Sequence, residues 1–355
     1  MKKKIVLTCL IVFLSGTLFA FPRQGFNRDV WEVTDFVWDC GIVALCDKGP
    51  DPHPPTFFIN EYSSQFNRER YRNIRAGDIV WIQCRFIAQF YEEILPEVEG
   101  PIVLVVSVGD ESFPSETGLA PEKIEEFLNS EKIVRIFAQN CDLLAPHPKV
   151  TLLPIGLDYH TISYKSLEGG WGEFGSPLMQ EAQLKQILLQ LPPTYLRKKR
   201  AFVDFQMSDT SGGGEKKRYL QLGENRTMIF NRLLRSGLID HASWMKRSAL
   251  WRTKGQYAFS ISPHGNGLDC HRTWEDLILG CIVIVKTSPL DSMYEGLPVV
   301  VVKDWDEITD ANLDRWLEQY KDAFTNPDYR HKLTHRYWMD QIKAVAQSYK
   351  KVMPE

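Results

Sequence analysis

Apolar residues in this chain occur in short continuous runs that alternate with helical patterns. Such runs are typical of strands buried on both faces. The expected strands of the first half cover residues 78–84, 102–107, 134–138 and 150–154, and a helix begins at Pro121. The expected strands of the second half cover residues 201–206, 257–261, 281–285 and 299–302, with helices over 226–236 and 270–279. The alternation predicts an α/β fold with parallel sheets.

The first twenty residues have the pattern of an export signal. Lys2, Lys3 and Lys4 precede an apolar run over Ile5–Leu14, and a small residue, Ala20, ends the segment. We expect residues 1–20 to be a signal peptide or, if uncleaved, an anchor, which is the chain's only expected contact with a membrane. The body is then exported or lies in the lumen of the secretory pathway.

The rhythm of strands and helices breaks over residues 163–200, where Pro192–Pro193 ends a helical stripe. We therefore expect one domain over 21–190 and a second over 191–330. The last segment, 331–355, carries a helical stripe that can cross back to the first domain.

Composition excludes some partners and leaves others open. The chain has 355 residues, 44% hydrophobic and 25% charged, with a net charge of −3, so nucleic acid is not an expected partner. Beyond the signal, six cysteines remain, an even number that permits disulfides. Cys40 and Cys46 are close enough in sequence to clip a loop, whereas Cys84 and Cys281 lie in apolar runs that predict buried thiols. No CxxC spacing occurs, and we expect no metal site.

The segment Ser260–Val285 carries the most informative chemistry, with the order strand, glycine loop, helix and strand. Gly265 and Gly267 allow a tight turn and close approach of a ligand, and the helix that follows directs free N–H groups at that loop. Arg272 can fork onto phosphate oxygens, and Glu275, three residues later, can accept the hydroxyls of a ribose. A tight turn with a surface Arg–Glu pair remains the structural alternative.

Two departures count against a dinucleotide site. Cys270 occupies the third small position of the usual fingerprint, and Lys286 stands where an acidic residue is expected. The chain also has no GxxxxGK[ST] motif. An NADP-dependent oxidoreductase with Lys286 on the 2′-phosphate stays as a minor alternative.

Three consecutive motifs, Ser262–Gly267, His271–Glu275 and Gly280–Ile284, resemble the C-terminal signature of exostosin-like glycosyltransferases. Further matches at Ser288–Leu290, Tyr294–Val300 and Asp304–Ile308 extend the similarity over about 255–310, and Pro154–His160 resembles the family's interdomain segment. Val283 departs from the family, which usually has proline there.

The resemblance implies a GT-B architecture, in which two Rossmann-like domains face each other across a cleft. The donor, a nucleotide-sugar such as a UDP-sugar, would lie on the second domain, with Arg272 on the diphosphate and Glu275 on the ribose. The phosphates would be lined by Ser262, Pro263, His264, Gly265, Asn266 and Gly267. Arg226, at the start of an expected helix, is a second phosphate candidate. Arginines and a helix dipole would neutralise the diphosphate without a cofactor or metal. We interpret Asp304–Trp305–Asp306 as helix capping rather than as a metal motif.

An inverting transfer needs a base on the first domain to deprotonate the hydroxyl of a carbohydrate or other acceptor. Asp110 and Glu111 follow the strongest strand, and Asp158 and His160 lie on the interdomain segment. Asp110 is the first choice because an acid at a strand's carboxyl end can face the cleft, although it can also cap a turn. A non-catalytic binding module for glycans or nucleotides, on the same fold, remains the main alternative function.

Overall fold

The first half of the chain forms a parallel sheet of four strands. The computed structural model describes residues 34–50, 65–164, 171–172, 175–207, 225–242 and 244–350, so the expected signal lies outside the described residues. The strands are β1 (Ile79–Ile82), β2 (Ile102–Val106), β3 (Ile133–Ala138) and β4 (Val150–Leu152), and they lie in chain order. Ile79 pairs with Val103 and Val106 pairs with Ala138, which aligns the carboxyl ends of β2 and β3.

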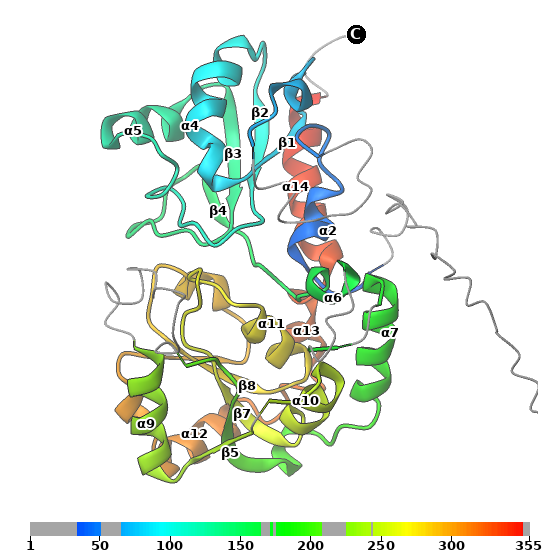
Figure 1. The fold of residues 1–355 in the computed structure, drawn as a ribbon, viewed down its shortest axis with the longest axis vertical. Coiled ribbons are helices and arrows are strands. Elements are labelled where there is room, and N and C mark those ends of the chain that lie inside the picture. The colour runs from blue at the N-terminus through cyan, green and yellow to red at the C-terminus, as the bar shows by residue number, and fades with distance from the viewer. Residues whose placement is uncertain are drawn as a thin grey trace, which may run out of the picture.

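The helices of the first half are mostly short, and the last of them lies beside the second half in Figure 1 rather than on this sheet. They are α2 (Asp39–Val43), η1 (Arg68–Tyr71), η2 (Cys84–Phe86), α4 (Ile87–Gln89), η3 (Phe90–Ile94), η4 (Leu95–Glu97), α5 (Pro121–Asn129), α6 (His160–Tyr164) and α7 (Pro177–Leu188). The strands β1 and β2 are buried at every position, because both faces of the sheet are covered.

The second half forms a parallel sheet of five strands, β5 (Lys198–Val203), β6 (Ile239–His241), β7 (Tyr257–Ile261), β8 (Ile282–Lys286) and β9 (Val299–Val302). Their spatial order is β6-β5-β7-β8-β9, so the direction of winding reverses between β5 and β7. The helices are α9 (Arg226–Ser236), α10 (Arg247–Lys254), α11 (His271–Ile278), α12 (Asp310–Gln319) and α13 (Pro327–His331), with short turns η5 (Thr194–Leu196), η6 (Asp291–Tyr294) and η7 (Trp305–Glu307). The predicted α/β class with parallel sheets is confirmed.

The last helix, α14 (His335–Lys350), packs against β1, β2 and α2 of the first half. Figure 1 shows this red helix running up from the second half along the edge of the first sheet. Its buried residues Trp338, Met339 and Ile342 belong to the same hydrophobic cluster as Val105 and Leu277. The two halves therefore share a continuous core on this side of the molecule.

Several sequence expectations need correction. β5 begins at Lys198, three residues before the expected strand over 201–206, and β6 and α10 were not expected at all. The six cysteines from Cys40 to Cys281 are free, so Cys40 and Cys46 do not form the disulfide that their spacing permits. The thiols of Cys84 and Cys281 are buried, as predicted.

Candidate functional site

The reversal of winding between β5 and β7 marks the place where open parallel sheets bind ligands, beyond the carboxyl ends of the two strands. Asp204 and Phe205 follow β5, and the Ser262–Gly267 loop follows β7. Helices α9 and α11 begin beside these ends, so their positive dipole ends converge on the same region, and the side chain of Asn225 caps the N–H of Met228 in the first turn of α9. We call this region the switch-point site.

Two arginines flank an aromatic ring at the switch-point site. The guanidinium carbon of Arg226 lies 6.0 Å from the centre of the Phe205 ring, and that of Arg272 lies 5.8 Å from it. Arg226 is the first residue of α9, and its Nε donates to the carbonyl of His264, 2.9 Å away. The site thus gathers two permanent positive charges at the starts of two helices, an arrangement that suits a diphosphate.

The glycine loop is tightly packed. A β-carbon at Gly265 would lie 2.6 Å from the Cys270 sulfur and 3.2 Å from Nη2 of Arg226. The Nδ1 atom of His264 contacts the carbonyl of Leu268 at 2.7 Å, and Ser262 Oγ lies 2.8 Å from Thr273 Oγ1. Within the loop only Asn266 is exposed, while Pro263 and the rest are buried.

The predicted ribose contact, Glu275, has a different partner in the structure. Its carboxylate accepts from Nη2 of Arg247 at 2.7 Å, and both side chains are at most 4% exposed. Arg247 also donates to Gln180 on α7, at 2.7 Å. The i,i+3 spacing predicted that Glu275 lies on the same helix face as Arg272. In the structure its carboxylate is buried and pairs with Arg247 of α10.

Arg272 belongs to a second group of charges. Its Nε lies 2.9 Å from Asp204, which also accepts from Nζ of the fully buried Lys254 at 2.7 Å. Lys254 lies 2.5 Å from Asp276 as well. Burial opposes ionisation of Asp204, yet Lys254 and Arg272 outweigh it and lower the pKa of this carboxyl. The network fixes the start of α11 against the end of β5.

The first half contributes residues that face the glycine loop. Asn140, with a φ of 49°, donates to the carbonyl of Gly109 at 2.9 Å and accepts from the N–H of Asp269 at 2.9 Å. A β-carbon at Gly267 would lie 2.7 Å from the Asn140 side chain. Asp269 in turn accepts from the N–H of Ile155 at 2.8 Å. Sequence reasoning missed Asn140 and Asp269, since contacts 129 positions apart leave no local pattern.

The candidate bases from the first half differ in their surroundings. Glu111 pairs with Arg85 at 2.7 Å. Asp110 is half-buried next to Gly109, in the segment that Asn140 ties to the second half. Burial is the main reason for the raised pKa of Cys270, and the charge of Asp110 contributes in the same direction. Asp110 therefore lies within electrostatic reach of the switch-point site.

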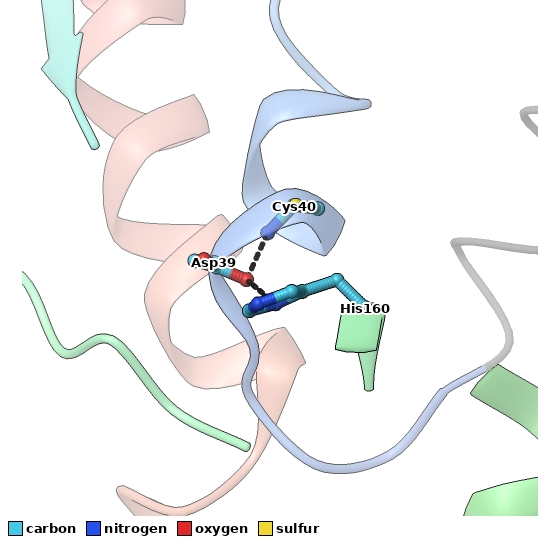
Figure 2. Close-up of side chains that lie close together, drawn as sticks. All are labelled: Asp39, Cys40 and His160. Carbon is cyan, nitrogen blue, oxygen red and sulfur yellow. Dashed lines mark hydrogen bonds and ion pairs between the residues drawn. The ribbon is translucent and has the colours of Figure 1, made fainter. Parts of the chain in front are cut away.

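Asp158 and His160 lie in a separate cluster between the halves. His160 Nε2 is 3.4 Å from Asp158, and its Nδ1 is 3.6 Å from Asp39 on α2. Figure 2 shows the imidazole lying beside the Asp39 carboxylate, which also accepts from the N–H of Cys40 at 2.7 Å. Burial lowers the pKa of His160, but the two carboxylates outweigh it and raise this pKa to about 9.

The Asp304–Asp306 pair is a helix cap, as predicted. Asp304 accepts from the N–H of Asp306 at 2.8 Å, and Glu307 closes a capping box at the start of η7. Arg232 of α9 binds both aspartates. Salt bridges thus occupy the two carboxylates that a metal would need.

A surface hollow of about 450 Å³ lies elsewhere, between η1 and η4, with Arg68, Arg72 and Glu97 in its lining. These residues precede β1 and β2, so the hollow is at the amino edge of the first sheet, opposite to Asp110. Among the described residues no helix is both long and apolar enough to span a membrane.

No family model matches the sequence, and comparison with curated proteins gives no match. Among solved structures, the N-terminal domain of Candida albicans trehalose-6-phosphate phosphatase is similar over 82% of this chain and 72% of its own, with a TM-score of 0.40 and 13% identity. An α,α-trehalose-6-phosphate synthase from Burkholderia multivorans is similar over 80% and 76%, with a TM-score of 0.38 and 12% identity. The pneumococcal O-GlcNAc transferase GtfA, solved with UDP and GlcNAc, is similar over 77% and 58%, with a TM-score of 0.34 and 14% identity. The substrates that these names mention are those of the solved proteins.

Proposed function

We propose that this protein is a GT-B glycosyltransferase that moves a sugar from a nucleoside diphosphate, UDP by preference, to a hydroxyl of a glycan or another acceptor. The exostosin-like motifs of the second half motivate the reaction class. The observation that carries the proposal is the pair Arg226 and Arg272, which flank Phe205 at the reversal of the second sheet. A diphosphate held there contacts two helix starts and two guanidinium groups.

The leaving group is stabilised by the second half. The acceptor oxygen forms a bond to the anomeric carbon, the bond from that carbon to the diphosphate breaks, and UDP leaves with the electron pair. Arg226 and Arg272 neutralise the charge that develops on the diphosphate, so the residues supply this stabilisation without a metal. The Ser262–Gly267 loop lines the phosphates through its backbone.

The acceptor is activated from the first half. We assign Asp110 as the base that takes the hydroxyl proton, because it lies at the carboxyl end of β2 on the segment joined to the glycine loop through Asn140. Glu111 forms an ion pair with Arg85, so we do not assign it as the base. We assign Glu275 a structural role, in which it pairs with Arg247 and does not bind the ribose.

Asp110→Asn and Glu111→Gln form a matched pair for the test. We expect Asp110→Asn to lower kcat for sugar transfer or donor hydrolysis by about 10²–10⁴-fold with little change in UDP affinity. Glu111→Gln keeps most of the activity. Equal losses in both variants would exclude Asp110 as the base. UDP binding without turnover on any acceptor in a broad panel would favour the non-catalytic binding module, and NADPH binding in place of UDP would favour the oxidoreductase.

We also propose that the chain is exported, with residues 1–20 acting as a signal or anchor. Mass spectrometry of the protein from its native host gives a mature chain that begins at Phe21 if the signal is cleaved. An intact N-terminus in a membrane fraction indicates an anchor, and an intact N-terminus in the cytosol contradicts export.

A further inference from the structure

Two imidazoles and a carboxylate converge where the two halves meet. Asp158 and His160 lie at the start of α6, after the first sheet, and His271 is the first residue of α11 in the second half. One donor atom from each of these residues lies within 4.8 Å of the donor atoms of the other two. The ring centres of His160 and His271 are 5.2 Å apart. Nothing in the proposed sugar transfer uses this cluster.

The second nitrogen of each imidazole already faces an oxygen. Nδ1 of His271 contacts the carbonyl of Gly156 at 2.8 Å, and Nδ1 of His160 faces Asp39 at 3.6 Å, as Figure 2 shows. Metal-bound histidines have this surrounding, because a carboxylate or carbonyl on the outer nitrogen fixes the ring and its tautomer. Nε2 of His160 lies on the side of Asp158, and Nε2 is the ring nitrogen of His271 that does not contact Gly156.

The spacing and charge of the donors suit a divalent ion. Nε2 of His160 lies 3.4 Å from Asp158 Oδ1. Two ligands at about 2.0–2.2 Å from one tetrahedral zinc are separated by about this distance. An ion that binds here displaces the proton that His160 holds between Asp39 and Asp158, and the two carboxylates then give the cluster two negative charges beside neutral rings. The positive charge of Arg247, which also acts on Asp158, is balanced by Glu275 at 2.7 Å.

We propose that Asp158, His160 and His271 bind a divalent transition-metal ion of the zinc class, with Asp39 as a positioning residue for His160. A set of two imidazoles and one carboxylate without thiolate fits zinc, cobalt, manganese or ferrous iron. Three protein ligands leave a position for water. The ion joins the segment after the first sheet to the first turn of α11, and so braces the two halves beside Arg272. Sequence spacing did not reveal this site, because His271 is more than a hundred positions from His160.

The test measures metal bound by the full chain. The protein is stripped with a chelator, equilibrated with zinc, dialysed and assayed by plasma mass spectrometry. We expect one zinc per wild-type chain and loss of that zinc in His160→Gln and His271→Gln. The control His241→Gln alters an exposed histidine on β6 and retains the zinc. Asp39→Asn weakens zinc affinity by about 10–100-fold.

A cobalt spectrum of the wild type and the zinc content of Cys40→Ser test the site and its ligands separately. Cobalt added to the wild-type chain gives the strong visible absorption of a four- or five-coordinate site, which requires no variant to fold. Cys40→Ser retains the ion, because the proposed ligands lie on the Nε2 side of His160. A wild-type chain that holds no zinc and gives no cobalt spectrum overturns the proposal. Full zinc in His271→Gln, or loss of zinc in Cys40→Ser, overturns the assignment of ligands.

Discussion

Nε of Arg272 lies 2.9 Å from a carboxylate oxygen of Asp204, a contact that ties the first turn of α11 to the carboxyl end of β5. Asp204 is shared with the fully buried Lys254, so the proposed phosphate-binding arginine is oriented by a charge network that extends into the interior. Orientation of a binding group by covered partners reduces the cost of ordering it when the ligand arrives.

Lys254→Met is expected to destabilise the protein strongly. Lys254 is fully buried and lies 2.7 Å from Asp204 and 2.5 Å from Asp276, so its removal leaves two carboxylates in the interior. Breaking a buried pair in this way costs about 3–5 kcal/mol of unfolding free energy, measured by urea denaturation. The control Lys199→Met removes an exposed pair with Asp314 and costs less than about 1 kcal/mol. Similar losses in the two variants would contradict the buried network.

Glu275→Gln separates a structural role from ligand binding. Because the carboxylate pairs with the buried Arg247, we expect a loss of about 3 kcal/mol in unfolding free energy and at most a twofold change in the dissociation constant for UDP. Glu318→Gln, on an exposed pair with Lys321, is the control for stability. A tenfold loss of UDP affinity at unchanged stability would instead support the ribose contact that spacing predicted.

His335 makes stability depend on pH. Burial lowers the pKa of this histidine to about 4, with a smaller contribution from Lys343, and both ring nitrogens lack a hydrogen-bond partner among the described residues. The unfolded chain takes up a proton near pH 6.5 and the folded chain does not, so stability falls as the pH drops from about 6.5 to 4. The loss approaches about 3 kcal/mol.

The measurement is urea denaturation of the wild type and His335→Gln at pH 7, 5.5 and 4.5. We expect a shallower fall with pH in the variant, whereas the exposed control His241→Gln follows the wild type. Parallel curves for the wild type and His335→Gln would show that this histidine does not carry the dependence.

Gly267→Ala tests the contact between the two halves. The added methyl group would lie 2.7 Å from the Asn140 side chain, which itself bridges Gly109 and Asp269. We expect a loss of about 1–3 kcal/mol in unfolding free energy. Asn140→Ala removes the clashing group, so the double variant is more stable than the sum of the single losses allows. Strict additivity would mean that the two residues do not touch.

The strands and the glycine loop were predictable because they depend on neighbours in sequence. Continuous apolar runs gave β1, β2, β7 and β8 within a few residues, and Gly265 and Gly267 marked the turn before α11. In contrast, α10 was missed because Arg247 and Lys254 are buried by ion pairs with distant carboxylates, which hides the apolar periodicity. For the same reason the sequence did not reveal the partner of Glu275. Its i,i+3 spacing from Arg272 predicts a shared helix face, but it does not show that Arg247 of α10 binds the carboxylate.

Binding of UDP to the switch-point site tests the central claim most directly. In calorimetric titrations of the full chain, Arg226→Met and Arg272→Lys are each expected to weaken UDP binding by at least about tenfold, since each removes a charge-assisted or forked contact. Arg232→Met, on the same helix as Arg226 but paired with Asp304 and Asp306, is expected to bind UDP like the wild type. A wild-type chain that does not bind UDP, or equal weakening in the Arg226 and Arg232 variants, would contradict the account.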